Sequence, residues 1–409
     1  MSDWKGVTLS EIATIQTGPF GSQLHASDYV VDGVPSIMPK NIGDRLDINI
    51  NDIARVRESD AVRLAKYRVT SGDIVYSRRG DVEKCAFITK QLDGWLCGTG
   101  CIRVRFTSSQ VDPMFIALHL STDETRGWIS GNAVGTIMPN LNTEILQRVP
   151  LNLPSLREQR AIAGVLSSLD DKIDLLHRQN KTVESLAETL FRQSLDVFPT
   201  KVKPLGTLIK ETVGGDWGKE TPEEDFNTAV NCLRGTDLAN LKDSLPSKTP
   251  VRFIKEEKLE KIRLLPGDIV FEISGGTENQ STGRAAIATE KMLQLFDNPA
   301  VFSNFCRLFR PHQKELGTFL YFYLTMLYSQ DEFFALENGS SGIKNLAYKT
   351  LLEDFHYPIP SHKDCVKIGE ELYPFLEKFF ENKLQIRLVE KLRDTLLPKL
   401  MSGEVRVEY

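Results

Sequence analysis

The sequence predicts an α+β protein made of two similar mixed α/β domains, each followed by a long α-helix, with the two helices paired as an antiparallel coiled coil. Three observations carry this prediction: an internal repeat along the 409 residues, β-rich runs broken by turn residues early in each repeat, and heptad spacing late in each repeat. We expect domains at 1–153 and 199–359 and helical regions at 154–198 and 360–409.

The internal repeat is an ordered series of matching segments. "GDIV" occurs at 72–75 and again at 267–270, "KCAFIT" (84–89) matches "RAAIAT" (284–289), and "MPNLNTEIL" (138–146) matches "IKNLAYKTL" (343–351). The offset drifts only from 195 to 206 residues along the series. Such a series indicates internal duplication, and antiparallel helices would relate the two halves by a pseudo-twofold axis.

Both helical regions carry apolar residues at alternating spacings of four and three. The seam of the first is Ile162, Leu166, Leu169, Ile173, Leu176, Asn180, Val183, Ala187 and Leu190, and that of the second is Ile368, Leu372, Phe375, Phe379, Asn382, Ile386 and Val389. One asparagine in each seam favours pairing of the two helices, because a polar seam residue fixes register and partner. The alternative is two unrelated amphipathic helices, each packed on its own domain.

Two further features concern the helix ends. Ser155 and Glu158 have the spacing of a capping box, which predicts the start of the first helix. Pro374 lies inside the second helical region, so we expect a kink or a late start there.

The composition is that of an ordinary globular protein, with 41% hydrophobic and 26% charged residues. The first residues contain acids and no unbroken apolar core, and the most apolar run, "TFLYFYLTML" (318–327), is too short to span a bilayer. We therefore expect a cytoplasmic protein with no membrane partner. The six cysteines form no Cys-x-x-Cys pair, which favours buried free thiols over a metal site.

Catalytic motifs are missing from the sequence. It has no phosphate-binding loop, dinucleotide fingerprint, nucleophile elbow or zinc-protease motif, and the glycine-rich "SGGTENQSTGR" (274–284) has the wrong spacing for phosphate binding. We expect a non-catalytic chain that binds no cofactor itself.

Polar, turn-rich loops favour recognition of DNA bases. Arginine suits guanine, and asparagine or glutamine suits adenine. The candidate DNA-binding residues are Phe20, Ser22, Gln23, His25, Lys40, Asn41, Arg78 and Arg79 in the first repeat and Arg234, Ser274, Lys344 and Asn345 in the second. The net charge of −5 opposes DNA binding, and each residue taken singly is equally well a solvated or ion-paired surface residue.

The helical segments resemble a known family. "LPSLREQRAIAGVLSSLDDKIDLLHRQNKTVESLAETLFRQ" (153–193) resembles the first conserved helix of specificity subunits of type I restriction-modification systems, and "LRDTLLPKLMSGE" (392–404) resembles the second. "TGPFGSQLHASDY" (17–29) looks like the opening of a target recognition domain of that family.

The resemblance implies a function for each part of the chain. Each target recognition domain is expected to read one half of a gapped, bipartite site in double-stranded DNA. The helix pair is expected to set the gap and to dock two modification subunits that carry S-adenosylmethionine and methylate adenine. Restriction subunits that cut or translocate DNA complete the complex, and the chain itself is implied to be no enzyme.

The sequence also departs from the family. The second helical region lacks the Glu158-Gln159 pair of the first, and "VGGDWGKE" (213–220) is unlike "TGPFGSQL" (17–24), so we expect two different half-sites. Two alternatives remain: a coiled-coil scaffold or adaptor with two peptide-binding domains, and an enzyme with an unrecognised site. The acidic net charge favours the scaffold, whereas the family-specific helices favour the DNA-specificity subunit.

Overall fold

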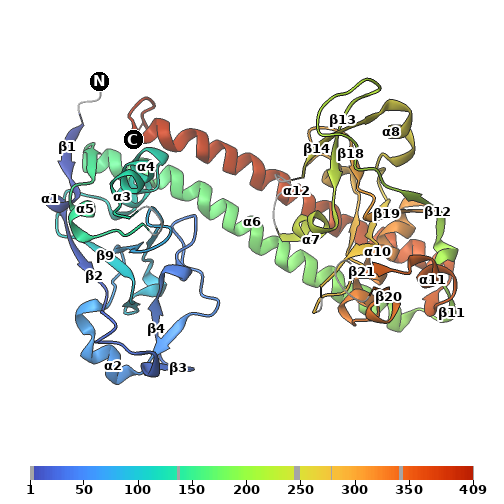
Figure 1. Cartoon of the computed structure of the whole chain (residues 1–409), viewed down its shortest axis with the longest axis horizontal. Coiled ribbons are helices and arrows are strands. Elements are labelled where there is room, and N and C mark those ends of the chain that lie inside the picture. The colour runs from blue at the N-terminus through green and yellow to red at the C-terminus, as the bar shows by residue number, and fades with distance from the viewer. Residues whose placement is uncertain (1–3, 136–138, 244–248, 278, 340–343, 409) are drawn as a thin grey trace. The chain divides into compact units, whose positions relative to one another are not determined.

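The computed structural model describes residues 4–135, 139–243, 249–277, 279–339 and 344–408. The chain falls into two compact units, the first formed by Met1–Asp171 with Glu390–Tyr409 and the second by Lys172–Val389. Each unit contains its own sheets and its own segments of two long helices (Figure 1).

The first unit is built around a four-stranded antiparallel sheet in the order β2-β9-β6-β7. A second sheet has the order β3-β5-β4-β8, with β4 and β8 parallel, and β1 pairs with β10. The strands are β1 Lys5–Thr8, β2 Ala13–Thr17, β3 Tyr29–Val30, β4 Val34–Ile37, β5 Ala54–Val56, β6 Ile74–Ser77, β7 Cys85–Phe87, β8 Leu96–Cys97, β9 Cys101–Phe106 and β10 Pro150–Leu153. The helices are α1 Leu9–Ile12, α2 Glu58–Arg63, α3 Pro113–Leu120, α4 Asp123–Asn132 and α5 Thr143–Gln147, with 3-10 turns at Ala26–Asp28, Pro39–Asn41, Ala65–Tyr67 and Lys90–Leu92.

The second unit repeats this plan. Its four-stranded sheet has the order β12-β19-β15-β17, a second sheet has the order β14-β13-β18 with β13 and β18 parallel, and β11 pairs with β22. The strands are β11 Thr200–Pro204, β12 Ile209–Gly214, β13 Phe226–Leu233, β14 Val251–Lys255, β15 Ile269–Glu272, β16 Ser274–Gly275, β17 Ala285–Ile287, β18 Ala300–Phe302, β19 Cys306–Pro311, β20 Glu337–Asn338, β21 Lys344–Leu346 and β22 His356–Pro360. The helices are α7 Gly235–Asp243, α8 Glu256–Ile262, α9 Glu290–Leu293, α10 Lys314–Ser329 and α11 Tyr348–Glu353, with 3-10 turns at Leu205–Leu208 and Phe334–Leu336. The matching strand orders confirm the internal repeat.

The repeated GDIV segment forms the same turn in both units. Gly72 and Gly267 have φ angles of +92° and +95°, a region that glycine enters without strain. Gly72 N donates to Ile88 O and Gly267 N donates to Ala288 O, both at 2.8 Å. The glycine recurs in the sequence because the same left-handed turn recurs in the fold.

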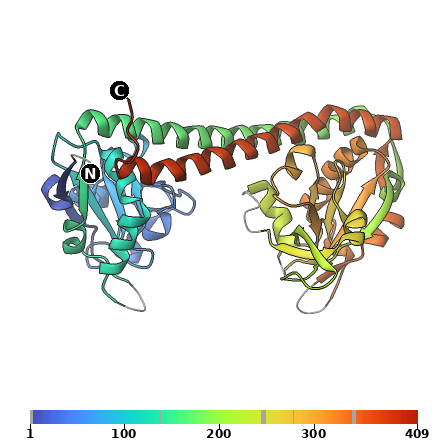
Figure 2. The same ribbon diagram turned by 90° about the horizontal axis from the view of Figure 1, so that it is seen from above.

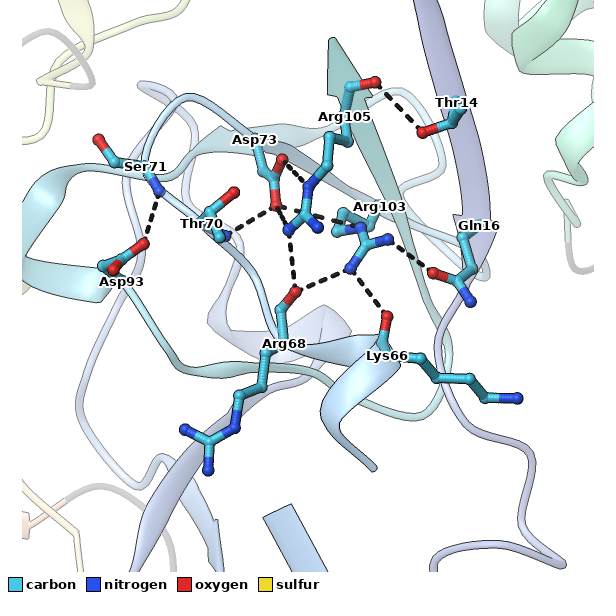
Figure 3. A network of polar contacts seen from close by, with 10 residues as sticks. All are labelled: Thr14, Gln16, Lys66, Arg68, Thr70, Ser71, Asp73, Asp93, Arg103 and Arg105. Atoms are coloured by element: carbon cyan, nitrogen blue, oxygen red, sulfur yellow. Dashed lines mark hydrogen bonds and ion pairs between the residues drawn. The ribbon is translucent and has the colours of Figure 1, made fainter. Parts of the chain in front are cut away.

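The aspartate of GDIV is a buried ion-pair partner in both units. Asp73 accepts from Arg105 Nε at 2.9 Å, from Arg105 Nη2 at 2.6 Å and from Thr70 N at 2.8 Å (Figure 3). Asp268 holds Arg310 in the same way, at 3.0 and 2.9 Å. These hydrogen bonds raise the pKa of both arginines. Because a buried charge needs a partner, each pair fastens the GDIV turn to the neighbouring strand.

One buried arginine of the first unit, Arg103, has no equivalent arginine in the second unit. Arg103 is 7% exposed and donates to Lys66 O at 3.0 Å, to Arg68 O at 2.7 Å and to Gln16 Oε1 at 2.6 Å (Figure 3). Burial lowers the pKa of Arg103. The equivalent residue of the second unit, two positions before the arginine paired with Asp268, is the buried Leu308. The repeat thus keeps the frame of the sheet and changes the interior chemistry.

The remaining core follows the composition. The apolar run 318–327 lies in α10 and is packed in the core of the second unit. Across the described ranges, no helix is long and apolar enough to cross a membrane. The six cysteines are free and buried, as predicted. Within the part of the chain that the structure describes, no three His, Cys, Asp or Glu side chains are grouped so that they could hold a metal ion.

The two long helices are α6, Leu156–Val197, and α12, His362–Met401. Ser155 Oγ accepts a hydrogen bond from Glu158 N at 3.2 Å, which is the predicted N-cap contact. Gln159, the next residue, binds the segment before α3 and donates through Nε2 to Gln110 O at 3.2 Å.

Of the kink or late start predicted at Pro374, the late start is wrong. α12 begins at His362 and continues through Pro374. Ser361 Oγ accepts from the backbone N of the third residue of the helix at 3.2 Å, so the helix is already capped before the proline. Proline removes one backbone donor, but Leu372 and Leu376 on either side of it are buried in the core, and this packing holds the helix together.

In the second unit α6 and α12 run antiparallel. Asn382 Nδ2 donates to Asn180 Oδ1 at 2.9 Å, so the two asparagines are partners. Before Asn180 in α6, Ile173 and Leu176 pack with Ile386, which follows Asn382 in α12. Figures 1 and 2 show these helix segments side by side. The antiparallel pairing predicted from the heptad spacing is confirmed.

The helix ends that belong to the first unit also pack on each other. Asp170 accepts from Arg393 Nη1 at 2.9 Å. Ile162 and Leu166 of α6 share a core cluster with Leu400 of α12 and with the domain itself. The order of contacts is again antiparallel.

The buried face of the helices is wider than a strict heptad seam. Most of the predicted seam is buried: Ile162, Leu166, Ile173, Leu176, Asn180, Ala187, Ile368, Leu372, Phe379, Asn382 and Ile386. Its other members are partly buried: Leu169, Val183, Leu190, Phe375 and Val389. Phe191 is buried instead of its neighbour Leu190, and its ring lies 5.6 Å from that of Phe319 in α10. The seam widens there because the helix packs on the domain core as well as on its helical partner.

Candidate nucleic-acid interface

Five loops meet at one edge of the main sheet in the first unit. There β2 and β6 end and β9 begins, because Thr17 pairs with Ile102 and Ser77 pairs with Cys101. Loops 18–21, 78–81 and 98–100 leave this edge. Loops 38–41 and 139–141 join them through two hydrogen bonds of 2.9 Å, Gly98 N to Ile37 O and Leu141 N to Arg78 O. We call these five loops the first loop end.

The second unit has a matching set. There β12 and β15 end and β19 begins, because Gly214 pairs with Arg307 and Glu272 pairs with Cys306. Loops 215–218, 273–276 and 303–305 leave this edge. Segments 234–237, at the start of α7, and 344–346, which is β21, join them through Ser303 N to Leu233 O and Leu346 N to Ile273 O, both at 2.9 Å. We call these loops the second loop end.

The shared hydrogen bonds identify equivalent residues. Arg78 N donates to Gly100 O at 2.8 Å, and Ile273 N donates to Phe305 O at 2.9 Å. Arg78 is therefore equivalent to Ile273, and Gly100 to Phe305. One position further along, Arg79 is equivalent to Ser274.

A second pair of bonds aligns the loops after β4 and β13. Met38 N donates to Asn41 Oδ1 at 3.0 Å, and Arg234 N donates to Asp237 Oδ2 at 2.9 Å. Asn41 and Asp237 thus brace the same turn, and Arg234 is equivalent to Met38.

Two glycines hold the openings of the two domains in the same place. A Cβ at Gly18 would lie 2.1 Å from Gly98 O, and a Cβ at Gly215 would lie 2.1 Å from Ser303 O. Any side chain at either position would collide with backbone. The two openings, which look unlike in sequence, therefore share the one residue that the close approach of the loops requires.

The predicted residues of the 17–29 segment differ in side-chain exposure and in whether a neighbouring residue already binds them. Phe20 is 54% exposed, and the Arg78 guanidinium lies 5.7 Å from its ring centroid. Ser22 and His25 are also exposed. Gln23 is partly buried, and its Oε1 accepts from a tyrosine hydroxyl, that of Tyr67, at 2.7 Å. Gln23 thus supports the loop with its carbonyl and keeps only its amide group for a ligand.

The other predicted residues of the first loop end divide in the same way. Lys40 and Arg79 are exposed and have no ionic partner among the described residues. Asn41 is 1% exposed, and its amide is used on both sides, by Met38 N and by Asn49 O. The structure therefore gives Asn41 a bracing role in the loop and leaves it no free edge for a base.

The predicted residues of the second loop end are held by neighbours. Arg234 donates to both oxygens of Asp237, at 2.9 and 3.0 Å, which raises the pKa of Arg234, and 41% of its side chain is still exposed. Ser274 Oγ donates to Asn345 Oδ1, so these two residues form one polar group. Lys344 Nζ forms an ion pair with a glutamate of β20 at 2.8 Å.

Sequence reasoning missed a buried ion pair beneath the second loop end. Glu272 is 1% exposed and accepts from Arg284 Nε at 2.8 Å. A Cβ on Gly235 or on Gly275 would lie 2.3 Å from Glu272 Oε1, so both loops close over this carboxylate. An acid at the end of a buried strand, with arginine at the end of a glycine-rich loop, was the available signal. The pair fixes the position of the loops that carry Arg234 and Ser274.

The helix pair of the second unit offers a separate surface. A polar groove with a volume of about 580 Å³ runs beside the asparagine pair and is lined by Lys172, Leu175, Arg178, Gln179, Lys378 and Gln385. Leu175 is 40% exposed, and Leu186 and Leu388 are 47% and 67% exposed.

Each unit therefore presents one set of loops at the edge of its main sheet, and the two sets share the same backbone hydrogen bonds. Residues 1–185 and 219–390 match the family described as type I restriction modification DNA specificity domain. The chain belongs to this family.

Individual relatives agree over nearly the whole chain. It is 22% identical to the HindI type I restriction enzyme specificity subunit of Haemophilus influenzae, covering 99% of this chain and 100% of the relative. It is 25% identical to the MjaIX specificity subunit of Methanocaldococcus jannaschii, covering 99% and 94%. The crystal structure of a type I S subunit from M. genitalium shares the fold, with a TM-score of 0.64, 16% identity and coverage of 97% and 96%.

Proposed function

We propose that this chain is the sequence-specific DNA-recognition subunit of a type I restriction-modification complex. It reads a gapped, two-part DNA target and directs the methyltransferase and restriction subunits to it. One observation carries the proposal: the same loop frame, held by the same backbone hydrogen bonds, occurs twice and carries different side chains.

The two loop ends differ in the chemistry they offer to bases. The exposed Arg79 of the first loop end is equivalent to Ser274 of the second. A guanidinium suits the two acceptors of guanine, whereas a hydroxyl joined to an amide, as in Ser274 and Asn345, suits adenine or a mixed edge. The two half-sites therefore differ in sequence.

Phosphate binding is also unequal between the loop ends. Lys40 is exposed and has no ionic partner among the described residues, whereas Arg234 and Lys344 are held by acidic neighbours. Counterion release scales with the number of cations that reach phosphate. The first half-site thus contributes more of the salt dependence of DNA binding, in spite of a net charge of −5.

The helix pair is proposed to dock two modification subunits, which carry S-adenosylmethionine and methylate adenine. Restriction subunits then join the complex. The exposed leucines and the polar groove of the helix pair support this docking role. We assign no catalytic step to this chain, because its part is to position the DNA.

The helix pair also sets the distance between the half-sites in this proposal. The asparagine pair supports it, because two buried amides bonded to each other hold one register of the helices and penalise every other. A fixed register gives a fixed spacing.

The test is a methylome. The chain is expressed with its modification subunit in a host free of DNA methylation, and modified adenines are read by single-molecule sequencing. We expect one gapped, two-part motif that disappears when this chain is omitted. A stable complex that produces no motif would instead support the scaffold reading.

A further inference from the structure

Two exposed phenylalanines mark the two loop ends. Phe20 is 54% exposed and Phe305 is 46% exposed. Among the described residues the other large exposed aromatic is Phe355, at 36%, which lies outside the loop ends and stacks on Tyr357 with centroids 6.3 Å apart. An exposed aromatic ring costs free energy in water. The presence of one such ring at each of the two matched sheet edges therefore suggests a role in binding.

The two rings are not inherited from one ancestral position. Phe305 is equivalent to Gly100, as the bonds to Ile273 and Arg78 show. Phe20 lies two residues after Gly18, and the residue two after Gly215 is Trp217. The ring of Trp217 is covered by the Arg252 guanidinium, 4.2 Å from its centroid, and is only partly exposed.

The second unit has therefore covered one aromatic ring and exposed another. Each loop end keeps one exposed phenylalanine, carried by a different loop. A residue kept only for folding would sit at the same place in both repeats, because the backbone frame is the same. The placement instead fits two surfaces that are shaped for different ligands.

The backbone of Phe305 is held firmly. Its carbonyl accepts from Ile273 N at 2.9 Å and from Ser274 N at 3.1 Å, and the next residue, Cys306, donates to Ser303 O at 3.0 Å. The ring has two side-chain torsions, so little conformational entropy is lost when it meets a ligand. Ser274, whose N donates to the Phe305 carbonyl, also donates through Oγ to Asn345 Oδ1, so a polar pair is joined to the backbone of Phe305.

We propose that Phe305 determines specificity in the second half-site by packing against the C5 methyl group of a thymine. This inference rests on the proposed function. In the major groove, thymine is the base that offers a methyl group, and phenylalanine is a side chain that packs on it. The adjoining Ser274–Asn345 pair supplies hydrogen bonds to a neighbouring base edge. Phe20 is the exposed phenylalanine of the first loop end, on a different loop, with Arg78 beside it.

The experiment uses the complete complex with its modification subunits. After the methylome has given the motif, equilibrium binding is measured on duplexes in which each thymine of the second half-site is replaced in turn by uracil. Loss of one buried methyl contact should weaken wild-type binding about fourfold at one position. Phe305→Ala should weaken binding to the natural duplex by at least that factor. The affinity of this variant should not change further when that same thymine is replaced by uracil.

Two variants complete the design. Phe305→Leu keeps an apolar side chain and should keep the preference for thymine over uracil, which separates contact with DNA from an effect on folding. Phe355→Ala removes an exposed phenylalanine away from the loop ends and should leave all binding unchanged. Duplexes altered in the first half-site should show the same relative losses in Phe305→Ala as in wild type.

Three outcomes would overturn the assignment. One is Phe305→Ala binding like wild type, a second is Phe305→Ala retaining the full uracil effect, and a third is an equal loss on unrelated DNA. Failure of the proposed function itself looks different, because the wild-type complex would then produce no methylation motif at all.

Discussion

The buried ion pair of the first GDIV segment allows a quantitative test of how the main sheet is held. In Asp73→Asn the side chain keeps its size but loses its charge. One amide oxygen cannot replace two carboxylate oxygens that accept from Arg105 twice and from Thr70 N once. The new Nδ2 group also faces the guanidinium, so two donors oppose each other.

The size of the effect follows from burial. The Asp73 side chain is 3% exposed, whereas that of Arg105 is 35% exposed and can take up water when its partner is lost. Removing one partner of a fully buried pair costs about 3–5 kcal/mol. With Arg105 partly rehydrated, we expect the lower limit, about 3 kcal/mol in the unfolding free energy of the first unit, or a factor of about 150.

Hydrogen exchange followed by mass spectrometry measures this loss in each unit separately. Protection of β6 and β9 should fall about 150-fold, and that of β15 and β19 should stay unchanged. Asp93→Asn is the matched control, because Asp93 is exposed and accepts one bond, from Ser71 N at 2.9 Å, which an amide oxygen can still accept. Equal protection in the two variants would refute the reasoning.

Four further predictions address the helices, the interface and pH. Asn180→Leu leaves the Asn382 amide buried without its partner, so the free energy of unfolding, measured by denaturant titration, should fall by about 1–3 kcal/mol. The double variant with Asn382→Leu should recover this stability, and an additive second loss would contradict the pairing. Arg79→Ala should relax the methylation motif in the first half-site only, whereas an equal loss on all DNA would make it a phosphate contact. A heptad inserted in both helices at matched positions should lengthen the gap in the motif, and an unchanged gap would refute the spacing role. Burial lowers the pKa of His119, so the folded protein favours the neutral imidazole. The stability of the first unit should therefore fall as the pH drops below about 6.5, the pKa of histidine in the unfolded chain. His119→Gln should flatten that part of the pH profile.

The heptad experiment requires an insertion in both helices. An insertion in α6 alone would leave α12 at its original length. Because α6 and α12 contact each other through Asn180 and Asn382, such an insertion would move one seam against the other and bury polar groups without partners. Both helices must be lengthened together.

Much of the fold was predictable because its signals are short in sequence. The heptad spacing of α6 repeats every seven residues, and the GDIV turn needs a glycine beside an acid. Patterns of this kind depend on neighbours within one or two turns of chain, so they are legible without knowing the partner. The Asn180–Asn382 pairing was the longest contact that could be inferred, because both seams carried the same unusual residue.

The candidate interface was only partly predictable. Lys40 and Arg79 are exposed as expected, but Asn41, chosen for the same chemistry, is buried and braces its loop. The sequence offers no sign of this, because the groups that consume its amide belong to backbone whose position the fold decides. Phe305 was not among the predicted residues, because a phenylalanine directly before a strand is expected to be part of the core.

The sequence by itself determined that the chain is built twice, that each copy ends in a helix of a matched pair, and that the chain resembles DNA-specificity subunits. These conclusions rest on periodicity and on repeated local segments. Only the tertiary structure decided which loops meet at the edge of each sheet, that Gly100 is equivalent to Phe305, and which polar side chains are left for DNA. Those facts depend on hydrogen bonds between strands that are far apart in the chain, and such bonds exist only once the sheets have formed.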